Sequence, residues 1–353
     1  MKCLDRYIAY QVLSAVFVVL LIIVGLDLIF EFVEQAGDIN ERYRFADVLS
    51  YLILRVPSRL YEFLPLSSLI GCMVGLGVLA SNSELTVMRA AGISIQRIVL
   101  SVLKPTMLLA ALALVLGEYV VPVTEQKAQS SRALAQSAGE ALQSKHGVWH
   151  REGGQFIHIN AVDPGGKIHG VTRYTFNDQR QMLVSSFAVS GVYSEGAWQL
   201  SNVVSTIFSD DHTKTKQVEQ ERWESGLTPT LLSVIVVDPM DLSITGLWSY
   251  SSYLRDQGLD YNQYLLAFWT KSLQPAGIFA LVLVAISFIF GPLRSVTVGQ
   301  RIIAGVIVGL IFKFSQDLLG PASTIVGFTP LLATVIPIII CFVVGLFLLR
   351  RAG

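Results

Sequence analysis

Val12-Leu-Ser-Ala-Val-Phe-Val-Val-Leu-Leu-Ile-Ile-Val-Gly-Leu-Asp-Leu-Ile-Phe-Glu-Phe-Val33 is an almost unbroken apolar run. A helix needs about 20 mainly apolar residues to cross the hydrocarbon core of a bilayer. Six runs of this kind predict membrane helices, at about 12–33, 60–80, 98–123, 264–290, 302–319 and 325–349. The first run lacks a small-residue cleavage site, which favours a retained anchor over a secretory signal.

The composition of the whole chain also indicates a membrane protein. Of its 353 residues, 52% are hydrophobic and 15% are charged, and 26 Lys and Arg balance 26 Asp and Glu. A typical soluble domain has about 25% charged residues, so an ordinary soluble globule and a disordered chain are both excluded. The even charge balance also excludes a basic nucleic-acid binder. Three cysteines are too few and too scattered for a disulfide framework or a metal cluster.

Basic residues near the helix ends predict the orientation of the chain. One side of the membrane collects Lys2, Arg6, Arg89, Arg97, Lys104, Arg294, Arg301, Arg350 and Arg351. Lys and Arg in short loops mark the cytoplasmic side. We therefore expect both termini to be cytoplasmic.

A polar segment, 124–262, separates two groups of three predicted helices. Its first residues are rich in helix formers, which predicts that the third helix continues beyond the bilayer. Runs of β-branched or aromatic residues then alternate with turn signals, at 156–159, 173–176, 182–193 and 198–208. Short strands with regular turns and no helices between them predict an antiparallel sandwich or jelly roll.

The predicted fold class is therefore an α-helical polytopic membrane protein with an inserted all-β, jellyroll-like domain outside the membrane. The expected domains are 1–123 with the first three helices, 124–262 with the strands, and 263–353 with the last three helices.

Motifs for catalysis are absent from the sequence. It contains no phosphate-binding loop, no His-Glu-x-x-His helix and no Gly-x-Ser-x-Gly elbow, so we expect no enzyme, no catalytic residue and no metal site. The cytoplasmic loops are too short to form a nucleotide-binding domain, so any ATP and Mg must bind to another subunit. The five histidines, His146, His150, His158, His169 and His212, have the irregular spacing of ordinary strand or surface residues. A metal or protease site is the alternative.

The cytoplasmic loop after the second helix predicts a short helix at about 83–92. Ser81 and Glu84 have the spacing of a capping box, and Gly92 suits the helix end. The apolar face of this helix is formed by Leu85, Met88 and Ala91 or Gly92. Two interpretations remain open: a helix on the membrane surface with Glu84 as a cap, or a helix that docks into a cytoplasmic partner with Glu84 near a partner arginine.

Ionisable residues inside the predicted membrane helices are costly, so they usually face a cavity, a partner helix or the interface. Lys313 and Asp317 are spaced to pair on the fifth helix, and Asp27 and Glu31 share one face of the first. Most such groups fall in the outer half of the membrane, which predicts a polar-lined cavity open to the outside; snorkelling or helix pairing is the alternative.

Within that cavity, a flexible ammonium or a forked guanidinium suits an anionic head group. The head-group candidates are Arg59, Lys271 and Lys313. The candidates for contact with acyl chains are Phe30, Phe63, Leu66, Ile311 and Phe312. Gly71 and Gly75 in the second helix, and Gly305 and Gly309 in the fifth, predict close helix packing or a movable helix interface.

Three segments carry a resemblance to a known family. They are Leu64-Pro-Leu-Ser-Ser-Leu-Ile-Gly71, Leu79-Ala-Ser-Asn-Ser-Glu-Leu-Thr-Val-Met-Arg-Ala-Ala-Gly92 and Ile286-Ser-Phe-Ile-Phe-Gly-Pro-Leu-Arg-Ser295. With the layout of three helices, a β domain and three helices, the chain resembles the YjgP/YjgQ permeases, the membrane subunits of the lipopolysaccharide export ABC transporter. This family has two paralogous branches, and the segments 290–294 and 317–321 look closer to one of them.

The resemblance implies a heterodimer with an LptF-like paralogous permease, bound to an LptB-like ATPase dimer and an LptC-like single-helix protein. The complex would extract lipopolysaccharide from the inner membrane and pass it through periplasmic jellyroll domains. Its coupling helix would be the segment 83–92, with ATPase contacts at Glu84, Leu85, Met88, Arg89 and Gly92.

The resemblance also implies that the first and fifth helices form gates, which fits Asp27, Glu31 and Asp317. Relatives carry lysines near the outer end of the first helix, whereas this chain has acidic residues there. We therefore expect this helix to pair with basic groups of a partner or with Lys313, in place of direct phosphate binding. The rival functions are a secondary transporter or ion channel that uses the intramembrane charges, and a membrane-anchored scaffold.

Overall fold

The computed structural model describes residues 2–39, 43–137, 148–162, 166–177, 179–209, 212–229, 232, 238–256, 260–291 and 296–352. The chain divides into two compact units. The first, called the membrane unit below, comprises Met1–Ile29, Val56–Val121 and Ser243–Gly353. The second, called the sheet unit, comprises Phe30–Arg55 and Pro122–Leu242.

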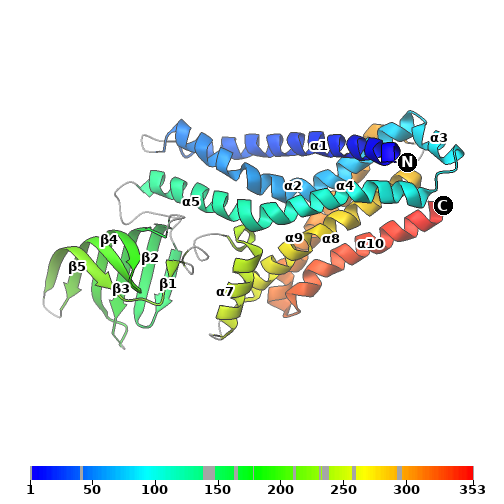
Figure 1. Ribbon diagram of the computed structural model, residues 1–353. Coiled ribbons are helices and arrows are strands. Elements are labelled where there is room, and N and C mark those ends of the chain that lie inside the picture. The colour runs from blue at the N-terminus through cyan, green and yellow to red at the C-terminus, as the bar shows by residue number, and fades with distance from the viewer. Residues whose placement is uncertain are drawn as a thin grey trace. The chain divides into compact units, whose positions relative to one another are not determined.

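The described helices are α1 (Lys2–Ala36), α2 (Phe45–Ser81), α3 (Glu84–Ala90), α4 (Ile95–Val115), the π-helical turn η1 (Leu116–Val120), α5 (Val121–Ser137), the 3-10 helix η2 (Pro239–Asp241), α7 (Ile244–Asp256), α8 (Asn262–Phe290), α9 (Val298–Val326) and α10 (Pro330–Ala352). The six long helices come in the predicted order, whereas η2 and α7, which precede the fourth of them, were not predicted (Figure 1). Six helices of the described chain are long and apolar enough to cross a membrane, which confirms the six predicted spans.

Two boundaries are informative. The third membrane helix continues through η1 to Ser137, which confirms its predicted extension. The predicted start of the sixth helix at 325 is wrong, because α9 continues to Val326. Gly327, at φ 83°, ends α9 in the left-handed conformation that glycine adopts readily, and α10 then begins with Pro330 in its first turn.

In the membrane unit, helix α2 packs closely against both α1 and α9. A Cβ atom at Gly71 would collide with Val16 of α1, and one at Gly75 would lie 2.9 Å from the carbonyl oxygen of Gln11. On α9, a Cβ atom at Gly309 would collide with the side chain of Leu66 on α2. The predicted close packing at these glycines is confirmed, because α1 and α9 both approach α2 at positions without a side chain.

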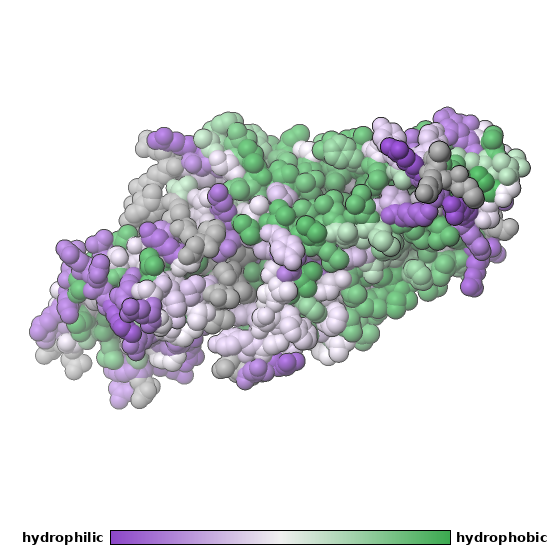
Figure 2. All heavy atoms as spheres, in the orientation of Figure 1, coloured by the Kyte–Doolittle hydropathy of each residue, from purple (hydrophilic) through white to green (hydrophobic). Residues whose placement is uncertain are grey.

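Helix α8 forms much of the remaining core, where it packs against α4 and α10. On the face of the membrane unit in Figure 2, apolar side chains cover the long helices, and polar side chains gather at the end that holds both termini and α3. An apolar surface over helices of this length is expected of a bundle embedded in lipid.

The strands of the sheet unit form one antiparallel sheet in consecutive order. They are β1 (Val148–Glu152), β2 (Gln155–Val162), β3 (Ile168–Phe176), β4 (Met182–Ser194), β5 (Ala197–Phe208) and β6 (Thr213–Trp223). The predicted all-β domain is confirmed. A second sheet, as in a sandwich, is not among the described residues.

The core of this sheet includes Ile157, Ile159, Val171, Leu200 and Val203. Trp198, also in this core, donates a hydrogen bond from its indole nitrogen to the carbonyl of Leu227, at 2.7 Å. Strands β1 and β6 were not predicted. Most positions of β6 are Thr, Gln, Lys or Glu, which give no signal of a buried strand. Strand β6 lies at the edge of the sheet, where charged side chains protect a strand from unwanted pairing.

Candidate functional site

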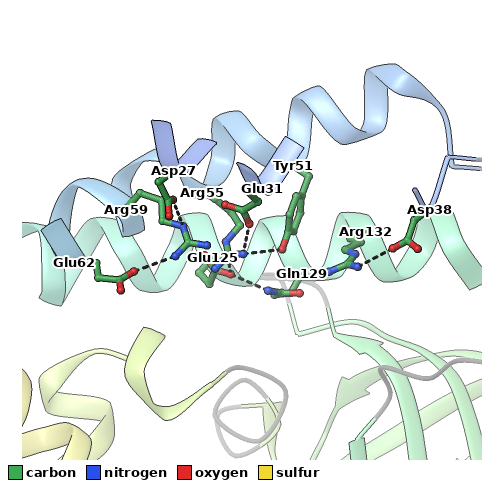
Figure 3. Close-up of polar contacts among 10 residues, drawn as sticks. All are labelled: Asp27, Glu31, Asp38, Tyr51, Arg55, Arg59, Glu62, Glu125, Gln129 and Arg132. Carbon is green, nitrogen blue, oxygen red and sulfur yellow. Dashed lines mark hydrogen bonds and ion pairs between the residues drawn. The ribbon is translucent and has the colours of Figure 1, made fainter. Parts of the chain in front are cut away.

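Four charged residues of the membrane unit form a chain of ion pairs across three helices. Arg59 of α2 contacts Asp27 of α1, with Nε 3.0 Å from Oδ2, and its Nη1 lies 3.0 Å from Oε2 of Glu62 (Figure 3). The other oxygen of Glu62 accepts a hydrogen bond from Nζ of Lys313 on α9, at 2.8 Å. These four residues, called the gate cluster below, connect α1, α2 and α9 and have no net formal charge.

A second group lies in the sheet unit and is more deeply buried. Arg55 of α2 pairs with Glu31 of α1, and its Nε lies 3.3 Å from Oε1 of Glu125 on α5 (Figure 3). Glu125 is fully buried and Glu31 is 5% exposed. Gln129 donates to Glu125 at 2.8 Å, and the hydroxyl of Tyr51 accepts a hydrogen bond from Arg55 at 3.0 Å. We call Glu31, Arg55 and Glu125 the buried triad.

A further ion pair of the sheet unit, also drawn in Figure 3, joins Arg132 and Asp38. Arg132 of α5 lies 3.2 Å from a carboxylate oxygen of Asp38, and its guanidinium stands over the ring of Tyr51 at 5.3 Å. The same ring is 5.5 Å from the guanidinium carbon of Arg55. The aromatic ring therefore lies against two cations, in a cation–π arrangement.

These contacts correct two predictions about pairing. Among the described residues, Asp27 and Glu31 pair with Arg59 and Arg55 of the same chain in place of Lys313. Pairing of the first helix with basic groups of a partner stays a prediction. Lys313 pairs with Glu62 of α2, and in the described chain its predicted partner Asp317 is exposed on α9.

Arg55, Glu125 and Arg132 were not among the predicted site residues. For Arg55 a signal existed. Asp27 and Glu31 are four residues apart, as are Arg55 and Arg59. Two antiparallel helices with this matched spacing bring each acid opposite one base.

The three head-group candidates do not come together. Arg59 and Lys313 belong to the gate cluster, whereas Lys271 of α8 is only 2% exposed. Its Nζ donates to the carbonyl of Gly117 at 3.3 Å and lies 5.3 Å from the centre of the Tyr61 ring. The structure therefore places Lys271 inside the helix bundle, apart from the other two candidates.

The acyl-chain candidates divide in a similar way. Phe30 and Ile311 are exposed, at 73% and 61%. Phe63 and Leu66 are half-buried, and Phe312 is a core residue that faces Gly277 of α8. The predicted outward cavity stays a prediction.

At the other end of the membrane unit, α3 has a different start from the predicted one. Ser81 is the last residue of α2, and its hydroxyl donates to the carbonyl of Val78. Ser83 precedes α3 at φ 62° and makes no side-chain cap. The predicted capping box is therefore wrong, because a left-handed turn at Ser83 separates the two helices. Glu84 instead accepts a hydrogen bond from the hydroxyl of Tyr7 on α1, at 2.9 Å.

The two sides of α3 face different surroundings. Leu85 is 5% exposed and Met88 is half-buried, and both pack against the core of the membrane unit. Leu85 and Met88, which belong to the predicted apolar docking face, therefore pack against other helices of the same chain. Val87, Arg89 and Gly92 remain exposed beside Glu84.

The start of α1 is tied to α4 close to α3. Asp5 accepts hydrogen bonds from Lys104 at 2.5 Å, Ser101 at 2.7 Å and Arg97 at 3.3 Å. These contacts and the bond from Tyr7 hold α1, α3 and α4 together at the end of the bundle that carries the exposed face of α3.

Histidines and acids do not assemble into a metal centre in the part of the chain that the structure describes. His146 lies outside the described residues. Burial lowers the pKa of His158, which stands beside Trp149 with ring centres 4.8 Å apart. Burial also lowers the pKa of His150, against the opposing effect of Glu152.

Comparison with known proteins covers almost the whole chain. Residues 6–351 match the family described as the lipopolysaccharide export system permease LptF/LptG. The chain is 37% identical over 352 residues to the lipopolysaccharide export system permease protein LptG of Haemophilus influenzae, with 99% of this chain and 98% of that protein covered. It is 34% identical over 356 residues to the LptG protein of Escherichia coli K12, with the same coverage. This chain therefore belongs to the LptF/LptG family of lipopolysaccharide export permeases, as its sequence motifs and its arrangement of helices and strands had indicated.

Proposed function

We propose that this chain is the LptG-type permease subunit of an ABC transporter that extracts lipopolysaccharide from the inner membrane and passes it to a periplasmic bridge. One observation carries the proposal: similarity to LptG proteins extends over 99% of the chain, through both groups of membrane helices and the inserted sheet. The proposed domains are 1–123, 124–262 and 263–353.

In this proposal the chain has no motor of its own, and ATP and Mg bind to an LptB-like ATPase dimer. Helix α3 supports the proposal, because it follows α2 after two residues and leads into α4 after four. A partner that displaces α3 would move two membrane helices directly. The proposed contact residues are the exposed Val87, Arg89 and Gly92 with the half-buried Glu84 beside them, while Leu85 and Met88 fix α3 to the bundle.

The proposed orientation has both termini and α3 in the cytoplasm and the sheet in the periplasm. Both termini lie at the same end of the membrane unit as α3 (Figure 1), which agrees with the basic residues at that end. The other proposed partners are an LptF-like permease, as the second half of a heterodimer, and an LptC-like single-helix protein.

The gate cluster is the proposed point of contact with the head group. In this structure the cations of Arg59 and Lys313 are both held by Glu62. A lipid phosphate would compete with Glu62 for Lys313 and so loosen α9 from α2, since phosphate and carboxylate bind the same donors. Phe30 and Ile311 are the proposed contacts for acyl chains, because both are exposed apolar residues.

The test is reconstitution of this chain with its LptF-like, LptB-like and LptC-like partners in liposomes that contain lipopolysaccharide. We expect ATP-dependent release of the lipid to a soluble periplasmic acceptor. Substitution of Glu84 by Ala should weaken binding of the ATPase and reduce release, whereas Glu219→Ala, a matched change on the exposed strand β6, should have no effect.

The rival functions give different results in the same assay. Transport by this chain alone, without ATP, would indicate a secondary transporter or channel. Normal export after Lys313 and Arg59 are both neutralised would indicate a scaffold, in which the helices only anchor the sheet. Retained ATPase binding in Glu84→Ala would indicate that α3 is a membrane-surface helix.

A further inference from the structure

The third membrane helix changes its winding at one place, between α4 and α5. Leu116–Val120 forms the π-helical turn η1. Turns of this kind are rare and occur mostly as single bulges, often at functional sites. They are also places where a long helix bends easily. In this chain η1 lies in the helix that begins directly after α3, so any displacement of α3 along α4 arrives at this turn.

The inner side of η1 is held by α8 and α2. Lys271 of α8 donates to the carbonyl of Gly117 at 3.3 Å and is 2% exposed. Tyr61 of α2 packs onto the same residue so closely that a Cβ atom at Gly117 would lie 2.8 Å from its ring. The Tyr61 ring also receives the Lys271 cation, at 5.3 Å, and its backbone carbonyl accepts a hydrogen bond from Gln274 at 2.9 Å.

A charged residue of the same turn holds the helix that leads into α8. Glu118 accepts hydrogen bonds from the backbone N–H of Ile244 at 2.8 Å, and from the backbone N–H and the hydroxyl of Thr245 at 3.4 and 2.5 Å. These groups form the start of α7, where the free N–H groups and the helix dipole favour a carboxylate. Glu118 therefore acts as the N-terminal cap of α7, supplied from another helix.

Helix α7 is in turn fixed to α8 by aromatic contacts. The rings of Trp248 and Phe268 are 5.1 Å apart, and those of Tyr250 and Tyr264 are 4.6 Å apart in a T-shaped arrangement. The turn η1, α7 and α8 are thus joined in a closed set of contacts, through Lys271 at Gly117 and through Glu118 at the start of α7.

We propose that Lys271 and Glu118 are positioning residues for transport, which make η1 a fixed joint. With both contacts in place, a displacement of α3 that travels along α4 moves α7 and α8 as well. Without them, the third helix bends at η1 and the displacement is lost there. Neither residue needs to touch the lipid. This inference rests on the proposed function, because it requires that α3 receives the movement of an ATPase.

The experiment compares Lys271→Met and Thr245→Val with the unmodified chain in the complete complex, reconstituted in lipid. Lys271→Met keeps the length of the side chain and removes the donor to Gly117. Thr245→Val keeps the shape and removes one bond to Glu118. Lys216→Met, on the exposed part of β6, is the matched control.

We expect both variants to hydrolyse ATP at the unmodified rate and to release about fivefold less lipopolysaccharide per ATP, the lower end of typical coupling between distant sites. Amide exchange at residues 116–121 should be about tenfold faster in Lys271→Met, as expected when a buried carbonyl loses a charged donor. A rescue experiment uses a chain in which Cys3, Cys72 and Cys341 have been replaced. In this background Glu118→Cys alone should reduce the release of lipopolysaccharide. Addition of Thr245→Cys and a short thiol crosslinker between the two cysteines should restore it.

The inference is overturned if release per ATP and amide exchange at η1 are unchanged in both variants. It is also overturned if ATP hydrolysis and release fall in the same proportion, because Lys271 then serves stability alone. Failure of the proposed function is a separate result: the unmodified complex would release no lipid with ATP, while the exchange measurement would still show whether Lys271 holds the turn.

Discussion

Removal of Arg55 should destabilise the protein strongly, because this guanidinium is shared by two buried carboxylates. Glu125 is fully buried and Glu31 is 5% exposed, and both contact Arg55. Loss of one partner from a buried ion pair costs about 3–5 kcal/mol, since the remaining charge stays buried. At about 2–4 °C per kcal/mol, Arg55→Met should lower the apparent melting temperature by about 6 °C or more.

The assay is thermal unfolding of the purified protein, followed by tryptophan fluorescence at constant detergent. Arg222→Met is the control, because Arg222 is 54% exposed and its pair with Glu224, at 3.7 Å, is worth at most about 1 kcal/mol. The triple variant Arg55→Met, Glu31→Gln and Glu125→Gln should recover most of the loss, since it leaves no buried charge. Equal melting of Arg55→Met and Arg222→Met would refute this account of the buried triad.

Two further predictions concern packing and pH. Gly71→Val should lower the free energy of unfolding by about 1–3 kcal/mol and weaken the contact of α2 with α1, because the valine side chain would occupy the space of Val16. Gly25→Val is the control in the same melting assay, because Gly25 has open space around it. The sheet should lose stability as the pH falls below about 6.5, because unfolded histidine binds a proton there while burial lowers the pKa of His158 in the folded state. Unfolding of the sheet at about pH 7.5 and 5.5 measures this effect, and His158→Gln should reduce it; an equal pH dependence in the variant would contradict the assignment.

The membrane helices and the order of the domains could be predicted from the sequence, because an apolar run of sufficient length has one stable arrangement in a bilayer. Strands β2 to β5 were predicted for a similar reason, since their apolar and aromatic runs are separated by turn residues. The two outer strands, β1 and β6, were not predicted; the polar residues of β6 belong to an edge and carry no signal of burial.

Pairing of charges was harder to predict than their position. The spacing of Lys313 and Asp317 allows a pair within α9, yet Lys313 contacts Glu62 on α2. A spacing within one helix identifies neighbours on that helix and says nothing of a nearer partner on the next one. The burial of Lys271 was missed in the same way, because its contact with Gly117 depends on how α8 meets the π turn.

The close packing of α2 against α1 at Gly71 and against α9 at Gly309 affects how easily these helices can rotate. At Gly71 the backbone of α2 meets the backbone of α1 at Val16, whereas at Gly309 the side chain of Leu66 of α2 fills the space that a side chain on α9 would occupy. Interlocked side chains resist rotation, because each must leave its socket before the helix can turn. By this reasoning α1 meets the smaller barrier to a slight rotation against α2 at Gly71, whereas the Leu66 side chain must leave its place at Gly309 before α9 can turn.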